Sequence, residues 1–333
     1  MIRVQNATRR MPAIVCLSLL CGGCALNQEL ARVHLEQGDA ALARHDLDVA
    51  LAEFQQAVEL NPEFAEGHTK LGLVYKQSGD LQKAAEALED AVRLDPFHFL
   101  SMFELGEVYR LLDRMTQAIR AYVLACKLDP DDFDSRFRLA TCYHRNGDLE
   151  QAIEAYETAL KIDAGNAYAW SNLGAVFDAR GTPYEAIRAY KRSLECDTQQ
   201  PVVLVNLATV YLNQERWMTA RRTLETTLQM APKLSVAHER LGYCNWREQK
   251  LDEAAESYGQ AVELNAKNAR ARAGYGVVRM TQYLNEPALV AYREEAIESW
   301  HRSLELDSDQ PKLRTLIEKY RVKSPKPVLS LEE

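Results

Sequence analysis

"WSNLGAVFDARGTPYEAIRAY", residues 170–190, is one copy of a pattern that recurs along the chain. This copy has a small residue at Gly174, a second small residue at Ala186 and a large residue at Tyr190. Alanine then recurs at intervals of 34 residues, at Ala50, Ala84, Ala118, Ala152, Ala186, Ala220 and Ala254. Self-similarity at a fixed period of this length predicts an array of stacked structural repeats.

The residues around each alanine keep the same sizes. Twelve residues earlier the chain has glycine or alanine, at Gly38, Gly72, Gly106, Ala140, Gly174, Ala208 and Gly242. Four residues later it has a large side chain, at Phe54, Leu88, Tyr122, Tyr156, Tyr190, Leu224 and Tyr258. Small residues at a fixed spacing let two helix backbones approach closely, and the large residue fills the space beside them. We therefore expect one packed helix pair in every repeat.

The pattern resembles the tetratricopeptide repeat. The fifth copy shows the signature best, with Trp170, Leu173, Gly174, Phe177, Ala186 and Tyr190. The resemblance implies an all-α, right-handed solenoid of about eight helix-turn-helix repeats with a C-terminal capping helix. The repeats are expected at 31–64, 65–98, 99–132, 133–166, 167–200, 201–234, 235–268 and, with an insertion, 269–310.

The eighth repeat departs from the pattern. Its small residue is displaced by eight positions to Ala296, which is followed by Trp300. Residues 285–287, Asn-Glu-Pro, are typical of a helix start, so we expect the second helix of this repeat to be two turns longer. Apolar residues on one face of 311–323 predict the capping helix. Residues 324–333, which contain two prolines, are expected to form a mobile tail.

The composition limits the classes of partner. Apolar residues make up 47% and charged residues 26% of the 333 positions, and the net charge is −8. Residues 1–23 hold Arg3, Arg9 and Arg10 and no acidic residue, so the remainder has 37 bases against 48 acids. A chain this acidic is a poor binder of phosphate backbones, and no nucleic acid partner is expected.

The N-terminus has the three parts of an export signal over 1–23: the basic residues, an apolar run at 11–20, and two glycines before Cys24. It resembles a bacterial lipoprotein lipobox, which implies a lipid on Cys24 and a short tether at 24–30. The match departs where Cys21 replaces the usual leucine. The alternative to a lipoprotein signal is an ordinary secretory signal peptide that is cleaved without lipidation. Ala25, where inner-membrane lipoproteins have aspartate, implies the outer membrane facing the periplasm.

The chain has no pattern that indicates catalysis. A redox or zinc reading of Cys21 and Cys24 lacks the βαβ context or the two further ligands. Nucleotide-binding, metalloprotease and nucleophile-elbow motifs are missing, and no histidine has a partner at metal spacing. We therefore predict a non-enzymatic protein without cofactor or metal. The other cysteines take positions that are aliphatic in other repeats, so we expect buried hydrophobic residues, with a disulfide as the alternative; they are Cys126, Cys142, Cys196 and Cys244.

In tetratricopeptide proteins the first helix of each repeat lines the inner face, through repeat positions 2, 5, 6, 9, 12 and 13. The resemblance therefore implies a partner-binding groove, centred on repeats three to five, for a protein or peptide segment. Its arginines predict an acidic segment. The chain lacks the carboxylate-clamp pattern, with which some tetratricopeptide proteins bind the C-termini of chaperones. An asparagine ladder, which has asparagine at position 6 of each repeat, would cover two repeats only. The predicted groove residues are Phe103, Arg110, Phe137, Arg138, Arg145, Asn172, Asn206, Tyr243 and Trp246.

The architecture resembles that of two groups of bacterial lipoproteins: pilot proteins for type IV pilus secretins and adaptors that recruit peptidoglycan hydrolases. It implies a scaffold or assembly adaptor in the cell envelope, held at the membrane by the lipid alone. The alternative function is a regulatory or recruiting subunit of an envelope enzyme, such as a cell-wall hydrolase or glycosyltransferase.

Overall fold

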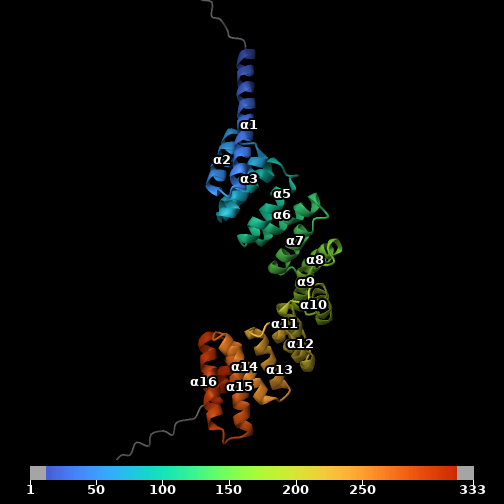
Figure 1. Ribbon diagram of the computed structural model, residues 1–333, viewed down its shortest axis with the longest axis vertical. Helices are drawn as coiled ribbons and strands as arrows, with labels where there is room; N and C mark the ends of the chain where they lie inside the picture. The colour runs from blue at the N-terminus through green and yellow to red at the C-terminus, as the bar shows by residue number, and fades with distance from the viewer. Residues whose placement is uncertain (1–12, 321–333) are drawn as a thin grey trace, which may run out of the picture. The chain divides into compact units, whose positions relative to one another are not determined.

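The computed structural model describes residues 13–320, with side chains from residue 25 onward, and these residues form 17 α-helices. The helices are α1 (Ala13–Ala43), α2 (Leu47–Leu60), α3 (Ala65–Ser78), α4 (Leu81–Leu94), α5 (Phe99–Leu111), α6 (Met115–Leu128), α7 (Phe133–Asn146), α8 (Leu149–Ile162), α9 (Ala167–Arg180), α10 (Pro183–Cys196), α11 (Pro201–Asn213), α12 (Trp217–Met230), α13 (Ser235–Arg247), α14 (Leu251–Leu264), α15 (Ala269–Asn285), α16 (Val290–Leu306) and α17 (Pro311–Tyr320). They pack as consecutive pairs, which confirms the predicted fold class (Figure 1).

The chain divides into two compact units, Met1–Ala164 and Gly165–Glu333. Within each unit, every helix packs on its pair partner, and the second helix of a pair packs on the first helix of the next. The first helices also contact one another directly, as α9 does α11, and α13 does α15. Equivalent positions on the first helices of one unit therefore form continuous rows.

The turn inside each of the first seven pairs contains one residue with positive φ, and these residues also recur every 34 positions. Three are glycines, which adopt this conformation without steric penalty. The others are non-glycine residues with φ between 57° and 62°. The seven residues are His45, Gly79, Asp113, Gly147, Gly181, Glu215 and Gln249. The turn geometry is thus a constant of the repeat, whichever residue occupies it.

The predicted contact between small and large residues is present in every pair. All seven repeated alanines have 0% exposed surface. A Cβ added at Gly174 would lie 2.8 Å from the ring of Tyr190, closer than unbonded carbon atoms approach. The eighth pair keeps the same contact in its displaced register, because Ala296 and Trp300 are buried and a Cβ on Gly276 would meet the Trp300 ring at 2.5 Å.

The insertion in the eighth repeat lengthens both of its helices. A helix start at 285–287 and a second helix two turns longer were expected, and both expectations were wrong. Asn285 ends α15 and α16 begins at Val290. Both helices have 17 residues, and their second-unit counterparts have 13 or 14. Paired extension keeps each added turn packed. Arg279 of α15 lies 4.4 Å from the ring of Tyr292, and Arg293 of α16 lies 5.7 Å from the ring of Tyr283.

Helix α17 covers the end of the second unit. Its buried residues Leu313 and Ile317 pack with Trp300 of α16. This is the position predicted for the capping helix. The predicted tail, 324–333, lies outside the described residues.

At the other end, α1 runs through Cys24 and the predicted tether. Residues 1–12 of the predicted signal, and the side chain of Cys24, lie outside the described part of the chain. None of the helices formed by the described residues has the length and apolarity needed to cross a membrane.

The cysteine prediction was correct at three positions and wrong at Cys196. Cys126, Cys142 and Cys244 are buried, whereas Cys196 is exposed. Cys196 is the last residue of α10, and its counterpart Met230 at the end of α12 is also 38% exposed, so this repeat position lies at a helix end rather than in the core. Burial raises the pKa of the Cys142 thiol to about 11, which keeps it protonated and unreactive at neutral pH.

The contact between small and large residues can be tested in α8. Ala152→Leu should lower the free energy of unfolding by about 1–3 kcal/mol, because the added carbons have no space between α7 and α8. Urea denaturation followed by circular dichroism measures this difference. The matched control is Glu157→Leu, which adds the same side chain at an exposed position of the same helix and should change stability by less than about 0.5 kcal/mol. Equal effects of the two substitutions would contradict the packing assignment.

Candidate functional site

The predicted groove residues of the first unit pack inside their own helix pairs. Phe103 stacks on Phe99 with ring centroids 6.0 Å apart, and meets the ring of Tyr122 edge-on at 5.8 Å. Phe137 repeats this arrangement in the next pair, at 5.7 Å from Phe133 and 5.8 Å from the Tyr156 ring of α8. Both phenylalanines are half-buried. They therefore contribute to the packing of each pair and present only part of a ring to the inner face.

The predicted arginines of this unit surround a carboxylate. Glu107 of α5 accepts a hydrogen bond from Arg110 Nη2 at 2.8 Å and a short one from the Tyr122 hydroxyl. Arg138 of α7 places its Nε 3.2 Å from Glu107 Oε1, an ion pair whose angle is too poor for a hydrogen bond. The third predicted arginine of this unit, Arg145, pairs with Asp113 at 2.7 Å. The positive charge predicted for an acidic partner is thus largely neutralised within the unit.

The same cluster shifts the titration of Glu107. Burial alone would raise the pKa of this carboxyl, but the hydrogen bonds from Arg110 and Tyr122 and the charges of Arg110 and Arg138 lower it overall. Burial and the Glu107 acceptor both raise the pKa of the Tyr122 hydroxyl, so tyrosine is the donor in this contact. Glu107 is therefore ionised at neutral pH and links α5, α6 and α7.

On the inner face of the second unit, fewer polar side chains have hydrogen-bond or ion-pair partners, and apolar side chains are exposed. Asn172 of α9 and Asn206 of α11 are half-buried, and neither side-chain amide hydrogen-bonds to another described residue. Position 2 of the first helices carries exposed apolar side chains: Tyr168 at 72%, Val202 at 63% and Val236 at 40% exposure. Because α9, α11 and α13 contact one another in turn, these three residues form one row, named the apolar row below.

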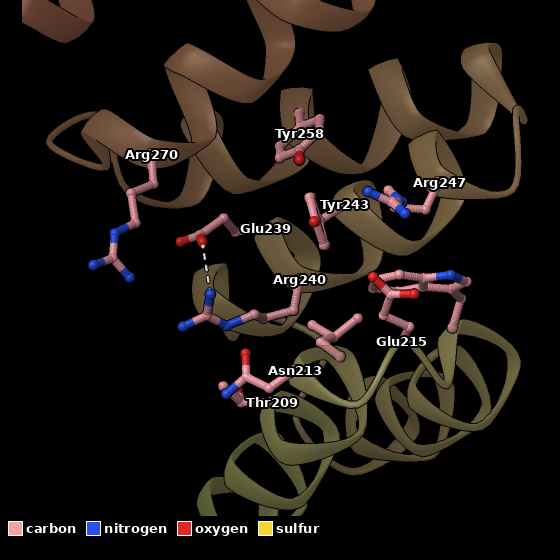
Figure 2. A pocket seen from close by; sticks show the side chains of 11 residues that line it. Thr209, Asn213, Glu215, Glu239, Arg240, Tyr243, Arg247, Tyr258 and Arg270 are labelled. Carbon is pink, nitrogen blue, oxygen red and sulfur yellow. Dashed lines mark hydrogen bonds and ion pairs between the residues drawn. The ribbon is translucent and has the colours of Figure 1, made fainter. Parts of the chain in front are cut away.

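A cavity of about 470 Å³ lies on the same face (Figure 2). One of its lining residues, Arg270, takes the repeat position that follows Val236 in the apolar row. The cavity is formed by α11, α13 and the first residues of α12 and α15, together with Glu215 of the turn before α12 and Tyr258 of α14. Its lining residues are Thr209, Leu212, Asn213, Glu215, Trp217, Glu239, Arg240, Tyr243, Arg247, Tyr258 and Arg270. Tyr243, a predicted site residue, is central to it.

Aromatic side chains form one wall of the cavity. Tyr243 meets the ring of Trp217 edge-on at 5.9 Å and lies 5.9 Å from Trp246. Trp246, also predicted, is not part of the lining but packs behind Tyr243 in the core of the seventh pair. Arg247 lies over the ring of Trp217, with its guanidinium carbon 4.4 Å from the centroid.

The charges in the cavity are unevenly paired. Glu239 is buried, accepts a hydrogen bond from Asn268 Nδ2 at 3.1 Å and lies 3.5 Å from Arg240 Nη1. Figure 2 shows this pair between Tyr243 and the free end of Arg270. Arg247 and Arg270 are exposed, and across residues 25–320 no acidic side chain forms an ion pair with either.

Arg247 and Arg270 were missed from the sequence, although the signal was there. The inner-face positions of repeats six to eight include most of the cavity lining: Thr209, Asn213, Glu239, Arg240, Tyr243, Arg247 and Arg270. The rule that repeat positions 2, 5, 6, 9, 12 and 13 line the inner face does not indicate which arginines already form ion pairs. Among the described residues no cluster of three ligating side chains could hold a metal ion.

The fold and this inner face together define a solenoid of tetratricopeptide repeats, in which stacked helix pairs present a binding surface rather than a catalytic centre. Family models agree. The tetratricopeptide repeat model matches residues 35–98 and 69–132, and the model of the cilia and flagella-associated protein 70 C-terminal domain matches residues 101–274, just over half of the chain. The chain belongs to this tetratricopeptide repeat family. Such families are generally non-enzymatic, and the chain is a scaffold for protein–protein interaction.

Solved structures share the fold. A crystal structure of the MamA protein is 27% identical over 51% of this chain and 93% of its own, with a TM-score of 0.50. A tetratricopeptide repeat protein from Parabacteroides merdae is 16% identical over 77% of this chain and 98% of its own, with a TM-score of 0.59. The crystal structure of the APC/C hetero-tetramer Cut9–Hcn1 is 19% identical over 86% of this chain and 56% of its own, with a TM-score of 0.55. The last two show the fold alone. No curated protein matches the sequence.

The Glu107 cluster generates a pH prediction. Glu107→Gln should lower the free energy of unfolding at pH 7 by about 1.5–3 kcal/mol, because it removes the charged acceptor of several hydrogen bonds. The folded-state pKa of Glu107 lies below its ordinary value of 4.5, so its stabilisation is present at neutral pH and is lost as the pH falls through the folded pKa.

Urea unfolding of both proteins at neutral and at acidic pH measures this. The difference between wild type and variant should shrink as the pH falls. Glu154→Gln, at an exposed position of α8, serves as the control and should change stability by less than about 0.5 kcal/mol. A difference that stays constant with pH would show that the carboxylate charge does not stabilise the fold.

Proposed function

We propose that the chain is an exported, lipid-anchored adaptor that binds a segment of a partner protein on the inner face of its second unit. The observation that carries the binding assignment is the apolar row. Three large apolar side chains exposed at one repeat position are not needed for packing, and contiguous exposed apolar surface is typical of interaction sites. The open cavity on the same face provides a place for a side chain of the partner.

The location rests on the N-terminus. Three arginines, an apolar run at 11–20, and Gly22-Gly23-Cys24 have the order of a lipoprotein signal. A lipid on Cys24 would hold the first repeat close to the membrane, and Ala25 favours the outer membrane facing the periplasm. The partners supported by this layout are envelope assemblies or envelope enzymes that the adaptor recruits.

The family match supports a second candidate, an adaptor in cilia or flagella, since the matching domain comes from a protein named for those organelles. For this candidate, neither lipidation of Cys24 nor export of the chain is expected. The fate of the N-terminus therefore separates the two.

In a bacterial host, Cys24→Ser should move the protein from the membrane fraction to the soluble extracytoplasmic fraction, because the variant lacks the thiol that takes the lipid. Fractionation with mass spectrometry of the N-terminus measures this. Cys21→Ser is the matched control and should stay anchored, since Cys21 leaves with the signal. A Cys24→Ser protein that stays membrane-bound with an intact N-terminus would rule out the lipid anchor.

The apolar row gives a test of the adaptor assignment. Val202→Asp combined with Val236→Asp should abolish partner capture from solubilised membranes without altering the melting temperature, because both side chains are exposed. Met218→Asp combined with Met230→Asp places the same charges on α12, at residues that are 60% and 38% exposed, and should leave capture intact. Equal capture by both double variants would place the binding face elsewhere.

A further inference from the structure

Two arginines distinguish the inner face of the second unit from that of the first. Arg110, Arg138 and Arg145 on the first unit are each ion-paired with an acidic side chain of their own unit. Arg247 and Arg270 border the cavity of the second unit and have no such pair among residues 25–320. In a chain with a net charge of −8, an unpaired pair of arginines at a cavity is a local excess of positive charge.

Arg247 is held in an orientation suited to a ligand. Its guanidinium carbon lies 4.4 Å from the centroid of the Trp217 ring, which is the distance of a cation–π contact. A guanidinium has five N–H donors, and no acidic side chain of residues 25–320 takes those of Arg247, so they can donate hydrogen bonds to a ligand. The contact with Trp217 reduces the freedom that the side chain would lose on binding. Arg247 therefore presents a partly immobilised set of donors at one side of the cavity.

Arg270 lies at the end of the apolar row. It takes the repeat position of Tyr168, Val202 and Val236, one repeat further along, on α15. A segment that covers Val202 and Val236 would next reach a guanidinium. Figure 2 shows Arg270 and Arg247 on opposite sides of Tyr243.

The carboxylates of the cavity do not satisfy these two arginines. Glu239 is buried and already engaged by Asn268 and Arg240. Glu215 is exposed at the rim and forms no ion pair with another described residue. The cavity thus has three arginines against two carboxylates, and one of the carboxylates is occupied.

We propose that this cavity binds a carboxylate side chain, Asp or Glu, of a partner segment whose flanking apolar residues lie along the apolar row. The inference rests on the proposed adaptor function and specifies the chemistry of its partner. The carboxylate accepts hydrogen bonds from the N–H groups of Arg247 or of Arg270, and the apolar residues cover Val202 and Val236. Charge complementarity selects the acidic segment, and the apolar contact supplies the remaining affinity.

The test uses the full chain, immobilised, and pools of acetylated heptapeptide amides. Each pool has one fixed central residue flanked by randomised Leu, Val, Phe and Tyr, and the central residue is Glu, Gln, Lys or phosphoserine. Retention is measured by mass spectrometry of the eluted peptides. Loss of one charge-assisted hydrogen bond corresponds to at least about tenfold in affinity, so the Glu pool should be retained about tenfold more than the Gln pool.

Matched variants assign this preference to the two arginines. Arg247→Gln combined with Arg270→Gln should abolish the preference for Glu, and both residues are exposed, so helicity should not change. Arg188→Gln combined with Arg222→Gln removes two exposed arginines from α10 and α12, makes the same change in charge, and should keep the preference.

Equal retention of the Glu and Gln pools, no retention of any pool, or a preference that survives the Arg247→Gln and Arg270→Gln changes would overturn the proposal. Stronger retention of the phosphoserine pool than of the Glu pool would indicate a phosphate ligand instead of a carboxylate, and would also overturn the proposal. Failure of the adaptor function would give a different result, in which the wild-type chain captures no partner from solubilised membranes. If wild-type capture depends on Val202 and Val236 while the pools show no preference for Glu, the adaptor stands and only the acidic partner falls.

Discussion

A steric constraint inside each helix pair sets the rest of the structure. The ring of Tyr190 occupies the volume that a Cβ on Gly174 would need, and Ala186 lies fully buried beside them. This contact fixes how closely the two helices of a pair approach and which way each one faces. Since it recurs every 34 residues, successive first helices lie in contact and their remaining positions align in rows. The binding face is a consequence of this packing, because those rows are what the packing leaves uncovered.

The two units use that face differently. In the first unit, Glu107 gathers Arg110, Arg138 and Tyr122, so the polar groups satisfy one another and stabilise the stack. A partner would have to displace these contacts. In the second unit, the cavity around Tyr243 has two arginines without acidic partners and lies on the same face as exposed apolar side chains. The same repeat positions thus serve stability in one unit and are available for recognition in the other.

The sequence predicted the fold well because its information is local and periodic. The 34-residue alanine spacing was sufficient to place the first seven pairs, and the order of a small residue followed by a large one located the displaced contact of Ala296 and Trp300 in the eighth. The sequence predicted the site less well. The rule for inner-face positions states where a side chain points but not which charges are already paired, so the groove was centred on Arg110 and Arg138, while Arg247 and Arg270 were not named. The prediction that Cys196 is buried was wrong for a related reason, since a repeat position that is usually aliphatic need not be buried when it lies at a helix end.

The most direct test of this account is a double-mutant cycle on the contact in the fifth pair. Gly174→Ala pushes a methyl group into the ring of Tyr190, whereas Tyr190→Leu creates space, and Ala208 with Leu224 is the natural form of this combination in the sixth pair. We predict that each single change destabilises the chain and that the double variant recovers at least about 1 kcal/mol relative to their sum. Additive effects, within about 0.5 kcal/mol, would show that the two residues do not set the helix spacing together, and would contradict the account.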